Sequence, residues 1–571
     1  MPRMPRAIVI GGGFGGMAAA LRLRRKGYEV TLIDKQDKLG GRAYAYEVET
    51  PVGTFKHDGG PTVITARFLF DELFALFGKR REDYVEFRDI YPWYRIVFAG
   101  ERGTGAPPVS ESGPDTGGAP VPRHFDYGGT IEQFEEQIRK FEPRDVEGFR
   151  RYLAHSKRIF DKGFTELGDQ PFDKFTTMLR CAPDLMRLGS WRTVWGMTKR
   201  YIRNENLRRV FSFQPLLVGG NPFNTTSIYS LIFYLERQWG VQFAMGGTGA
   251  IVAALERLMR EEGVEIRLGE EVSRIEVDDQ WFGGTLGMWR NHKLAKGASL
   301  KSGAQISATT VVCNGDTPLA TKTLIDPEHR WRSDVQIARL KYSMGLFVLY
   351  FGTTRAYPDV AHHTIVLGRA YRDLLYRLFD KRELEREDLS VYLHRPTATD
   401  PSFAPPGCES FYVLVPVPNL QPRPLRAPTV REGLRSNAIA GSTAETPPSR
   451  SGLRDVPVRE DGAIDWRAFG ETFKRDVIRY LERTVLPGLS ECVVGDFFVT
   501  PEHFRDNLNT MYGTGFSVQP IFRQSAWFRF HNRSEDVDGL YFVGAGTHPG
   551  AGMPGVLCSA KVVDRLIPAV G

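Results

Sequence analysis

Glycines near the start of the chain have the residue type and spacing of a dinucleotide-binding loop. Gly11, Gly13 and Gly16 follow an apolar stretch at residues 7–10 and open an Ala- and Leu-rich stretch. In such a loop one glycine permits a tight turn, one lets the backbone approach a pyrophosphate, and one allows close helix–strand packing. The amino end of the helix then offers free N–H groups and a partial positive charge to phosphates. The pattern therefore predicts that a dinucleotide binds here.

Two further features follow at the spacing that such a nucleotide requires. Asp34 ends the next predicted strand, where its carboxylate is placed to accept a hydrogen bond from a ribose hydroxyl and disfavours a 2′-phosphate. Gly41 and Arg42 come next, and the arginine can pair with a pyrophosphate that folds back over the loop. A nicotinamide enzyme has no use for this second glycine pair, so a larger nucleotide is favoured. The alternative is a plain surface turn.

A second turn beside this loop is defined by its backbone. Gly60, Pro61 and Thr62 follow Asp58, and Pro61 fixes the direction of the chain. We assign Gly60, Pro61, Thr62 and, further along, Val272 to the cofactor site. Asp58 is equally well explained as a side chain that caps the turn.

The last thirty residues contain the most specific motif. A predicted strand at 540–543 runs into a turn of small residues, and Pro554 suits a first helical turn, where its missing N–H costs nothing. The N–H groups at this helix start can face a flavin pyrimidine oxygen and stabilise the negative charge that develops when the flavin takes a hydride. The two chain ends are thus predicted to form one flavin site. Its C-terminal members are Gly544, Gly546, Thr547, Met553, Pro554 and Val556.

Composition excludes several other classes of protein. The 571 residues are 42% hydrophobic with a net charge of +7, as in a globular chain of two or three domains. The five cysteines stand far apart, which predicts reduced thiols rather than disulfides or a metal site. No run of eighteen apolar residues is present to span a bilayer. No histidine has the spacing of a metal ligand, and we expect only His548 near the cofactor.

The predicted elements indicate an α/β fold with a discontinuous Rossmann-like FAD-binding domain, an inserted β-sheet substrate domain and a helical membrane-facing domain. Strands are predicted at 93–98, 344–351, 390–394 and 411–416, and helices between residues 130 and 237 with breaks at Pro143, Pro171, Pro183 and Pro215. The predicted domains are residues 1–75, 241–320 and 496–571 for FAD, 76–130 and 321–495 for the substrate, and 131–240 for the membrane. Segments 103–122, 283–303 and 421–457 are polar and rich in Gly, Pro and Ser, so we expect them to be insertions without order.

Apart from these insertions, the whole chain resembles the bacterial and fungal phytoene desaturases, which are FAD-dependent carotenoid oxidoreductases within the amine-oxidase-like flavoproteins. The resemblance is carried by Asp34 and by residues 11–16, 40–44, 58–64, 143–148, 217–223 and 544–556. It implies stepwise removal of hydrogen pairs from phytoene, a forty-carbon polyene, to give products such as neurosporene or lycopene. It also implies a peripheral enzyme on the cytoplasmic side of the cell membrane, FAD reoxidised by a quinone or oxygen, and no nucleic-acid partner.

The resemblance bears on the catalytic residues as well. The family has an Asp–x–x–Arg pair that has been discussed as acid–base machinery, and Arg180 matches its arginine. Thr177 stands at the acidic position, which puts a fixed carboxylate base in doubt. Loss of a hydride next to a double bond leaves an allyl-stabilised cation, which a weak base can deprotonate.

A basic segment is the candidate for the membrane contact. Residues 180–209 carry eight Lys and Arg residues against two acidic ones, interleaved with Leu185, Leu188, Trp191, Val194, Trp195 and Tyr201 at roughly helical spacing. Such a segment can lie in the interface of an anionic bilayer. The alternative is a helix whose apolar side packs on its own domain.

The size of the substrate supports the prediction that the protein contacts a membrane. Transfer of a forty-carbon hydrocarbon into water costs on the order of 25–30 kcal/mol at roughly 0.8 kcal/mol per methylene. The substrate must therefore pass from the bilayer into an apolar tunnel. Residues 211–213, 228–235 and 347–351 are candidate walls, although such stretches are more often plain core.

Other functions remain open from the sequence. A carotenoid isomerase, a ketolase or an amine oxidase would keep the flavin and change the chemistry. A flavin-free protein that escorts prenylated proteins is a non-enzymatic alternative on the same fold. A nicotinamide dehydrogenase is the weakest alternative, because Arg42 and the C-terminal motif would then have no part in binding the cofactor. Hydrolysis is disfavoured because Ser517 and Ser559 lack the context of a nucleophile elbow.

Overall fold

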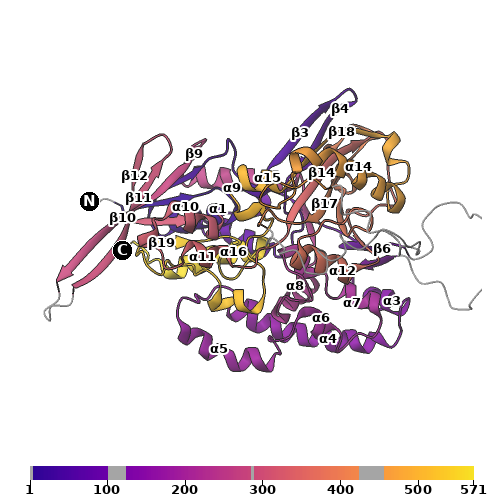
Figure 1. The fold of residues 1–571 in the computed structure, drawn as a ribbon, viewed down its shortest axis with the longest axis horizontal. Helices are drawn as coiled ribbons and strands as arrows, with labels where there is room; N and C mark the ends of the chain where they lie inside the picture. The colour runs from indigo at the N-terminus through magenta and orange to yellow at the C-terminus, as the bar shows by residue number, and fades with distance from the viewer. Residues whose placement is uncertain (1–3, 101–123, 284–288, 423–455, 571) are drawn as a thin grey trace, which may run out of the picture.

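The computed structural model describes residues 4–100, 124–283, 289–422 and 456–570, and a five-stranded parallel sheet lies at one end of the molecule (Figure 1). Its strand order is β19-β13-β1-β2-β9. The strands are β1 (Arg6–Ile10), β2 (Glu29–Asp34), β9 (Glu265–Leu268), β13 (Thr310–Cys313) and β19 (Leu540–Phe542). β1 and β13 read as continuous apolar runs because parallel strands are buried on both faces.

This parallel sheet is covered on both faces. One layer contains α1 (Phe14–Arg25), α2 (Phe68–Ala75), α9 (Gly247–Glu261) and α16 (Met553–Leu566), whose apolar sides share one core. The other layer contains the three-stranded sheet β10 (Val272–Gly283), β11 (Trp289–Leu300) and β12 (Gln305–Ser307), with α10 (Thr317–Leu324). Helices α1 and α16 contact each other although they come from opposite ends of the chain. The predicted pairing of the termini in one fold unit is confirmed.

The second large sheet has seven strands in the order β18-β14-β17-β16-β15-β6-β7. Alternation along β14 separates its two faces: Phe347, Leu349 and Phe351 pack toward α14 (Trp466–Thr484), while Leu346, Val348 and Tyr350 face the other side. The strands are β6 (Tyr94–Phe98), β7 (His124–Tyr127), β14 (Gly345–Thr353), β15 (His363–Leu367), β16 (Val391–His394), β17 (Glu409–Val417) and β18 (Val493–Val499). All four strands predicted in this part of the chain are therefore confirmed.

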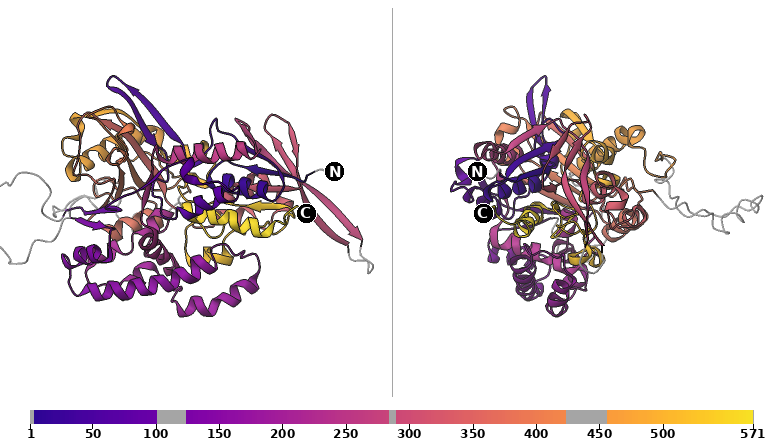
Figure 2. Two further views of the ribbon diagram at one scale, coloured as in Figure 1. Left: turned by 180° about the vertical axis from the view of Figure 1, so that it is seen from behind. Right: turned by 90° about the vertical axis from the view of Figure 1, so that its left-hand side faces the viewer.

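A helical layer lies beneath both sheets, as the views in Figures 1 and 2 agree. It contains α3 (Ile131–Arg139), α4 (Asp145–Phe160), α5 (Phe175–Arg187), α6 (Val194–Thr198), α7 (Glu205–Val210) and α8 (Leu231–Trp239). α4 continues into a π-helical turn at Asp161–Glu166, and α8 packs against α4. Smaller elements are the pairs β3 (Ala45–Thr50) with β4 (Gly53–Asp58) and β5 (Phe87–Asp89) with β8 (Gln242–Ala244), and helices α11 (Asp334–Ala338), α12 (Tyr371–Tyr376) and α15 (Pro501–Asp506).

Two sequence predictions need correction. The segment 283–303 was expected to be an unordered insertion, but β11 pairs antiparallel with β10 over nearly its whole length. Its polar residues misled the prediction because backbone pairing, rather than apolar periodicity, holds this hairpin. Pro183 lies inside α5 and does not end it. The predicted insertions at 103–122 and 421–457 fall almost entirely outside the described residues. No helix in the described part of the chain is long and apolar enough to cross a membrane.

Candidate functional site

A large cavity of about 880 Å³ runs from the carboxyl ends of the parallel strands to the seven-stranded sheet and the helical layer. Ligands of open α/β sheets bind at this edge of a parallel sheet. Most of the predicted site residues line the cavity, namely Gly11, Gly13, Asp34, Gly41, Arg42, Gly60, Pro61, Thr62, Val272, Gly544, Gly546, Met553, Pro554 and Val556. The structure thus brings both chain ends and the internal turn together around one space. Gly16, Thr547 and Arg180 do not line it.

The N-terminal loop leaves a free helix end facing the cavity. Gly13 is the N-cap of α1, with no side chain capping it and no acidic residue in the first turn, so its N–H groups are open to a ligand. Gly16 lies behind the loop, where a Cβ atom would stand only 1.9 Å from the Gly11 carbonyl oxygen. Gly16 therefore serves helix–strand packing, and Gly13 borders the ligand space.

Asp34 is held in place by the same loop. Its Oδ2 accepts a hydrogen bond from the N–H of Gly12 at 2.6 Å, and its Oδ1 accepts from the N–H of Gln36 at 2.8 Å. Burial raises the pKa of Asp34, and these backbone donors oppose the shift. The carboxylate is thereby fixed at the cavity wall.

The C-terminal loop presents a second free helix end to the cavity. α16 begins after Gly552, whose φ is 90°, with no capping side chain and with Pro554 in the first turn. Thr547 is buried behind the loop, where its Oγ1 donates to the Gly544 carbonyl at 3.1 Å and its own carbonyl accepts from Arg529 Nε at 2.9 Å. Thr547 thus shapes the loop rather than lining the cavity, because its short side chain is used by the turn itself.

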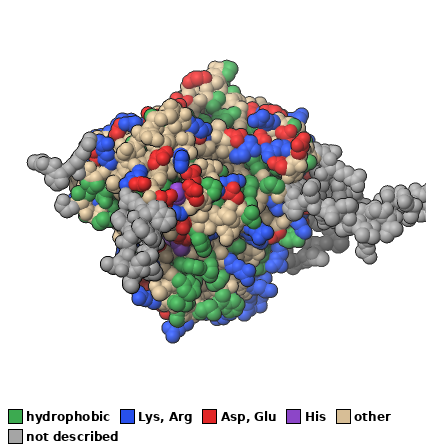
Figure 3. Space-filling model, turned by 60° about the vertical axis from the view of Figure 1, so that its left-hand side comes forward, with side chains coloured by type: hydrophobic (Ala, Val, Ile, Leu, Met, Phe, Trp, Pro, Cys, Tyr) green, Lys and Arg blue, Asp and Glu red, His purple; other side chains and the backbone are tan. Residues whose placement is uncertain are grey.

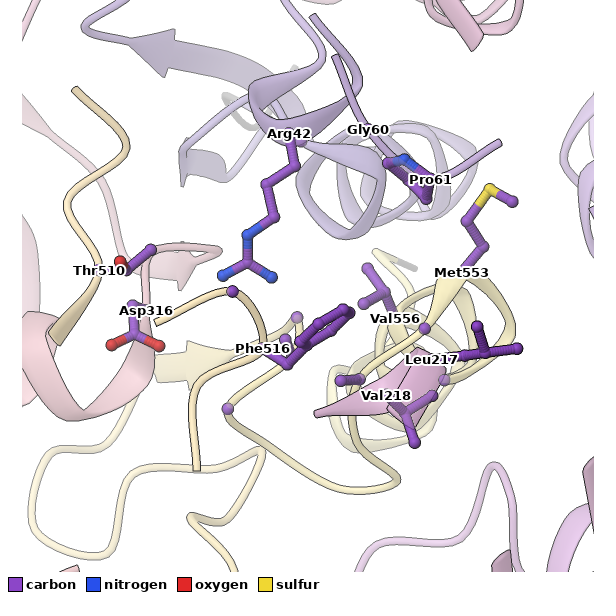
Figure 4. A pocket seen from close by; sticks show the side chains of 18 of the residues that line it. Arg42, Gly60, Pro61, Leu217, Val218, Asp316, Thr510, Phe516, Met553 and Val556 are labelled. Atoms are coloured by element: carbon purple, nitrogen blue, oxygen red, sulfur yellow. The ribbon is translucent and has the colours of Figure 1, made fainter. Parts of the chain in front are cut away.

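Arg42 reaches into the cavity in the direction of Asp316 and Thr510, opposite the start of α16 (Figure 4). Asp316 is buried, and one of its carboxylate oxygens accepts a hydrogen bond from the N–H of Met511 at 2.9 Å. Burial raises the pKa of Asp316, against the nearby Arg42 and Arg529. Sequence reasoning missed Asp316, although its place just after β13, at the carboxyl end of a parallel strand, was a usable signal.

The wall toward the seven-stranded sheet carries a buried polar network. Thr62 Oγ1 lies 2.9 Å from the Tyr392 hydroxyl and 2.8 Å from the Tyr412 hydroxyl. The Tyr392 hydroxyl lies 2.7 Å from His363 Nδ1, which is 3.3 Å from His394 Nδ1. Thr62 was a predicted site residue, but the other members were missed because they come from β15, β16 and β17 and meet only through sheet pairing.

Three histidines that do not line the cavity lie close together beside this network. Ring nitrogens of His362, His363 and His394 lie within 4.8 Å of one another. Burial lowers the pKa of His362 and His363 well below the ordinary value, so these rings are neutral. No sequence spacing indicated this group, because His394 comes from the neighbouring strand. His548, which was expected near the cofactor, lines the cavity, and burial lowers its pKa to about 4.

The other end of the cavity is apolar. Its walls include Phe213, Leu217, Ile228, Ile232, Val348 and Ile365. Of the stretches expected to form tunnel walls, 211–213 and 228–235 contribute lining residues. In 347–351 Val348 is a lining residue, while Phe347 and Phe351 belong to the core beneath α14. The cavity therefore has one polar end that suits a nucleotide and one apolar end.

Arg180, the candidate catalytic residue, is not among the residues that the structure brings to the cavity. It lies on the exposed side of α5 and outside the cavity wall, to which the same helix contributes Met178 and Leu185. The catalytic role of Arg180 stays a prediction that this geometry does not support.

The residues present fit a flavin nucleotide. Two helix ends without capping side chains, a fixed carboxylate and the cavity-facing Arg42 surround one space. A side chain at Gly13 would enter that space beside Asn314, whose Nδ2 would be 3.0 Å from a Cβ atom. The fold and site define a flavin-dependent oxidoreductase.

Comparison with known proteins agrees with this class. The profile of the flavin containing amine oxidoreductases matches residues 14–408. The chain is 39% identical to the lycopene-forming phytoene desaturase of Pseudescherichia vulneris over 99% of both chains, and 37% identical to the neurosporene-forming enzyme of Rhodobacter capsulatus over 99% of this chain and 94% of that one. The chain therefore belongs to the phytoene desaturase family within the flavin containing amine oxidoreductases.

The fold is similar to that of a solved oxidoreductase from Methanosarcina mazei. The TM-score is 0.56 at 17% identity, with 98% of this chain and 100% of that chain covered. At this level of identity the likeness concerns the fold alone.

Proposed function

We propose that the protein is a phytoene desaturase that uses FAD to remove hydrogen pairs stepwise from phytoene, giving neurosporene- or lycopene-type carotenoids. One observation carries the proposal: a single cavity joins the two free helix ends to a long apolar chamber. Such a chamber suits a hydrocarbon, and the helix ends suit a nucleotide. The desaturases named above are its relatives over nearly the full length.

FAD is the flavin that this site suits best. The N–H groups at the start of α1 would face the pyrophosphate, Asp34 would accept from the ribose, and Arg42 would neutralise charge on the phosphates. Residues 60–62 and the start of α16 would border the ring, which supplies hydride acceptance when bound. Val272 would lie at the nucleotide end, beside Glu271. Under the same proposal, residues 1–75, 241–320 and 496–571 form the FAD domain, 76–130 and 321–495 the substrate domain, and 131–240 the membrane-facing domain.

The proposal includes a peripheral contact with the cytoplasmic face of the cell membrane. Large apolar side chains are exposed around α5, namely Phe175, Leu179, Met186, Trp191, Phe522 and Phe528, and we call these residues the apolar patch. Figure 3 shows hydrophobic side chains gathered on the lower part of one face with Lys and Arg around them. Phe522 also lines the cavity, so the chamber reaches the surface at this patch. A hydrocarbon could thus pass from the bilayer without crossing water.

The membrane segment differs in detail from the one expected. Val194 and Trp195 are buried and pack on their own domain, whereas Leu179 and Met186 of α5 are 57% and 59% exposed. The basic residues nearest these side chains in sequence are Arg180 and Arg187, both exposed. We therefore place the contact on α5 rather than across the whole basic segment.

Purified protein supplied with phytoene in liposomes, under anaerobic conditions with an added quinone, tests the proposal. Coloured polyenes and release of FAD on denaturation are expected, and a parallel arm with oxygen identifies the acceptor. Isomerised substrate without a gain in double bonds would favour the isomerase alternative, and an oxygenated product the ketolase. A colourless protein that does not change phytoene would contradict the proposal and favour a flavin-free escort.

A further inference from the structure

Glu236 is a buried acidic residue that lines the cavity among largely apolar side chains. It lies on α8, its residue is 0% exposed, and it lines the cavity together with Tyr94. Its Oε1 accepts a hydrogen bond from the Tyr94 hydroxyl at 3.0 Å, and its Oε2 accepts from the Tyr127 hydroxyl at 2.7 Å. Gln214 Nε2 donates in turn to the Tyr127 hydroxyl at 3.1 Å. Both oxygens are thus held by phenols.

Neither substrate binding nor packing explains this carboxyl group. Burying a carboxylate among aromatic rings is costly, and phenol donors offset only part of that cost. The proposed substrate is a hydrocarbon and offers no polar group for Glu236 to recognise. An apolar side chain of similar volume would pack on Phe213 and Phe233 without the penalty, since both belong to the surrounding core. A costly polar group beside a cavity is a candidate for chemistry.

A chain of contacts connects Glu236 with the turn proposed to border the flavin ring. The Tyr94 ring is 5.9 Å from the His363 ring, and His363 is hydrogen-bonded to Tyr392, which contacts Thr62. Just beyond the end of α8, Gln242 pairs through its backbone with Ile64, at 2.8 and 3.3 Å. α8 is therefore anchored beside residues 60–62, the turn proposed to border the ring.

We propose that Glu236 is the general base of the desaturation, an inference that rests on the function proposed above. In each step one carbon of the substrate gives up a hydride to the flavin, and its neighbour gives up a proton to the Glu236 carboxylate. The electron pair of the second C–H bond becomes the new double bond. Reoxidation by a quinone consumes the hydride equivalent and this proton, which yields the quinol and restores the carboxylate.

Electrostatics suit this role. Burial raises the pKa of Glu236 to about 7, so the carboxylate is populated near neutral pH and is more basic than an exposed glutamate. The titratable and charged groups around it are Tyr94 on β6, Tyr127 on β7 and Arg237 on its own helix. Burial raises the pKa of both tyrosines well above the ordinary value, so they stay protonated and act as donors throughout.

The test is anaerobic single-turnover reduction of the bound flavin by phytoene in liposomes, with Glu236→Gln and, as a matched control, Glu256→Gln on the outer side of α9. Positioned general bases contribute about 10²–10⁴-fold, so we expect Glu236→Gln to lose at least about 100-fold in the reduction rate while it keeps its flavin. Glu236→Asp should recover part of that rate. Glu256→Gln should match the wild type, because Glu256 lies outside the cavity and pairs with Arg260.

Tyr94→Phe and Tyr127→Phe keep the test decisive if the glutamine variant does not fold. Each removes one donor to the carboxylate, so the pH midpoint of the reduction rate should shift upward from about 7 while the flavin stays bound. A wild-type rate in Glu236→Gln, or unshifted pH midpoints in both tyrosine variants, would overturn the inference. A wild-type enzyme that phytoene does not reduce would instead overturn the proposed function itself.

Discussion

Gly15 and Gly544 face each other so closely that a Cβ atom added to Gly15 would lie 3.4 Å from the backbone nitrogen of Gly544. The same atom would lie 2.6 Å from Asn314 Oδ1 and 3.0 Å from Val556 Cγ1. The loops that follow β1, β13 and β19 therefore meet at one point, where only backbone and small side chains fit. This contact brings the starts of α1 and α16 to the same cavity.

Gly16→Ala is expected to impair folding. Its Cβ atom would lie 1.9 Å from the Gly11 carbonyl oxygen, and neither β1 nor α1 can retreat within the packed sheet. Overpacking of this kind should cost about 3 kcal/mol, the upper end of the usual range. Soluble yield and the urea midpoint of unfolding check this, with Ala253→Val on the exposed side of α9 as the control. A soluble Gly16→Ala protein of wild-type stability would contradict the packing role.

Gly13→Val is expected to lose the flavin and keep the fold. Gly13 borders the cavity, and a Cβ atom there would meet the Asn314 side chain at 3.0 Å, with no backbone atom closer than the Gly40 oxygen at 3.9 Å. The added methyl groups would occupy the space proposed for the pyrophosphate and weaken flavin binding by more than roughly tenfold. Flavin absorbance of the purified protein, beside its circular dichroism, is the measurement. A yellow Gly13→Val protein would show that the nucleotide lies elsewhere.

These two glycines show how far sequence reasoning reached. Some features depend on residues that are neighbours in the sequence, so they can be recognised from the sequence alone. They are the loop at residues 11–16, the strands of the large sheet and the start of the C-terminal helix. The distinction between Gly13 and Gly16 within the motif also follows from the known geometry of such loops. Both roles agree with the space that the structure leaves around each residue.

Features that depend on distant segments were not predictable in the same way. Asp316 and the network of Tyr392, His363 and His394 arise where separate strands meet, and each residue alone looks like ordinary core. The hairpin at 283–303 was misjudged because β11 is stabilised by its partner β10. Arg180 was chosen from a motif match, and only the helix orientation shows that it faces solvent.

Substitution of the apolar patch should separate membrane docking from flavin binding. Leu179→Asp combined with Met186→Asp replaces two exposed apolar side chains on α5 by charges. Each apolar side chain contributes about 1.5–3 kcal/mol when it enters the bilayer interface, so we expect vesicle binding to fall more than tenfold. Co-sedimentation with anionic liposomes measures this, and the flavin content should not change.

The matched control for the patch is Val52→Asp. Val52 is 44% exposed at the turn between β3 and β4, which lies on the opposite side of the molecule from α5 (Figure 1). This variant should co-sediment like the wild type. Equal loss in both variants would indicate nonspecific adsorption, and no loss in the double variant would exclude α5 as the contact.

Replacement of Lys199 and Arg200, both exposed, by glutamate should also weaken binding to anionic vesicles. This loss of binding should be smaller in high salt, because salt screens the attraction between the protein and the vesicle.

The buried carboxyl group makes a prediction about stability that does not depend on catalysis. Burial raises the pKa of Glu236 to about 7 from 4.5, so between these values the folded protein binds a proton that the unfolded chain releases. The resulting stabilisation is fully present below pH 4.5 and is lost as the pH rises through 7. The full loss is on the order of 3 kcal/mol. A glutamine cannot ionise, so Glu236→Gln should escape this loss.

We therefore expect the melting temperature of Glu236→Gln, relative to the wild type, to be higher at about pH 8 than at about pH 5. Glu256→Gln serves as the control, because Glu256 lies outside the cavity and pairs with Arg260 on α9. Differential scanning calorimetry of the two variants and the wild type at both pH values makes the comparison. If the offset of Glu236→Gln were the same at both pH values, the carboxyl group would have an ordinary pKa. Its burial would then carry no electrostatic penalty, and the reason for assigning it a proton-accepting role would be lost.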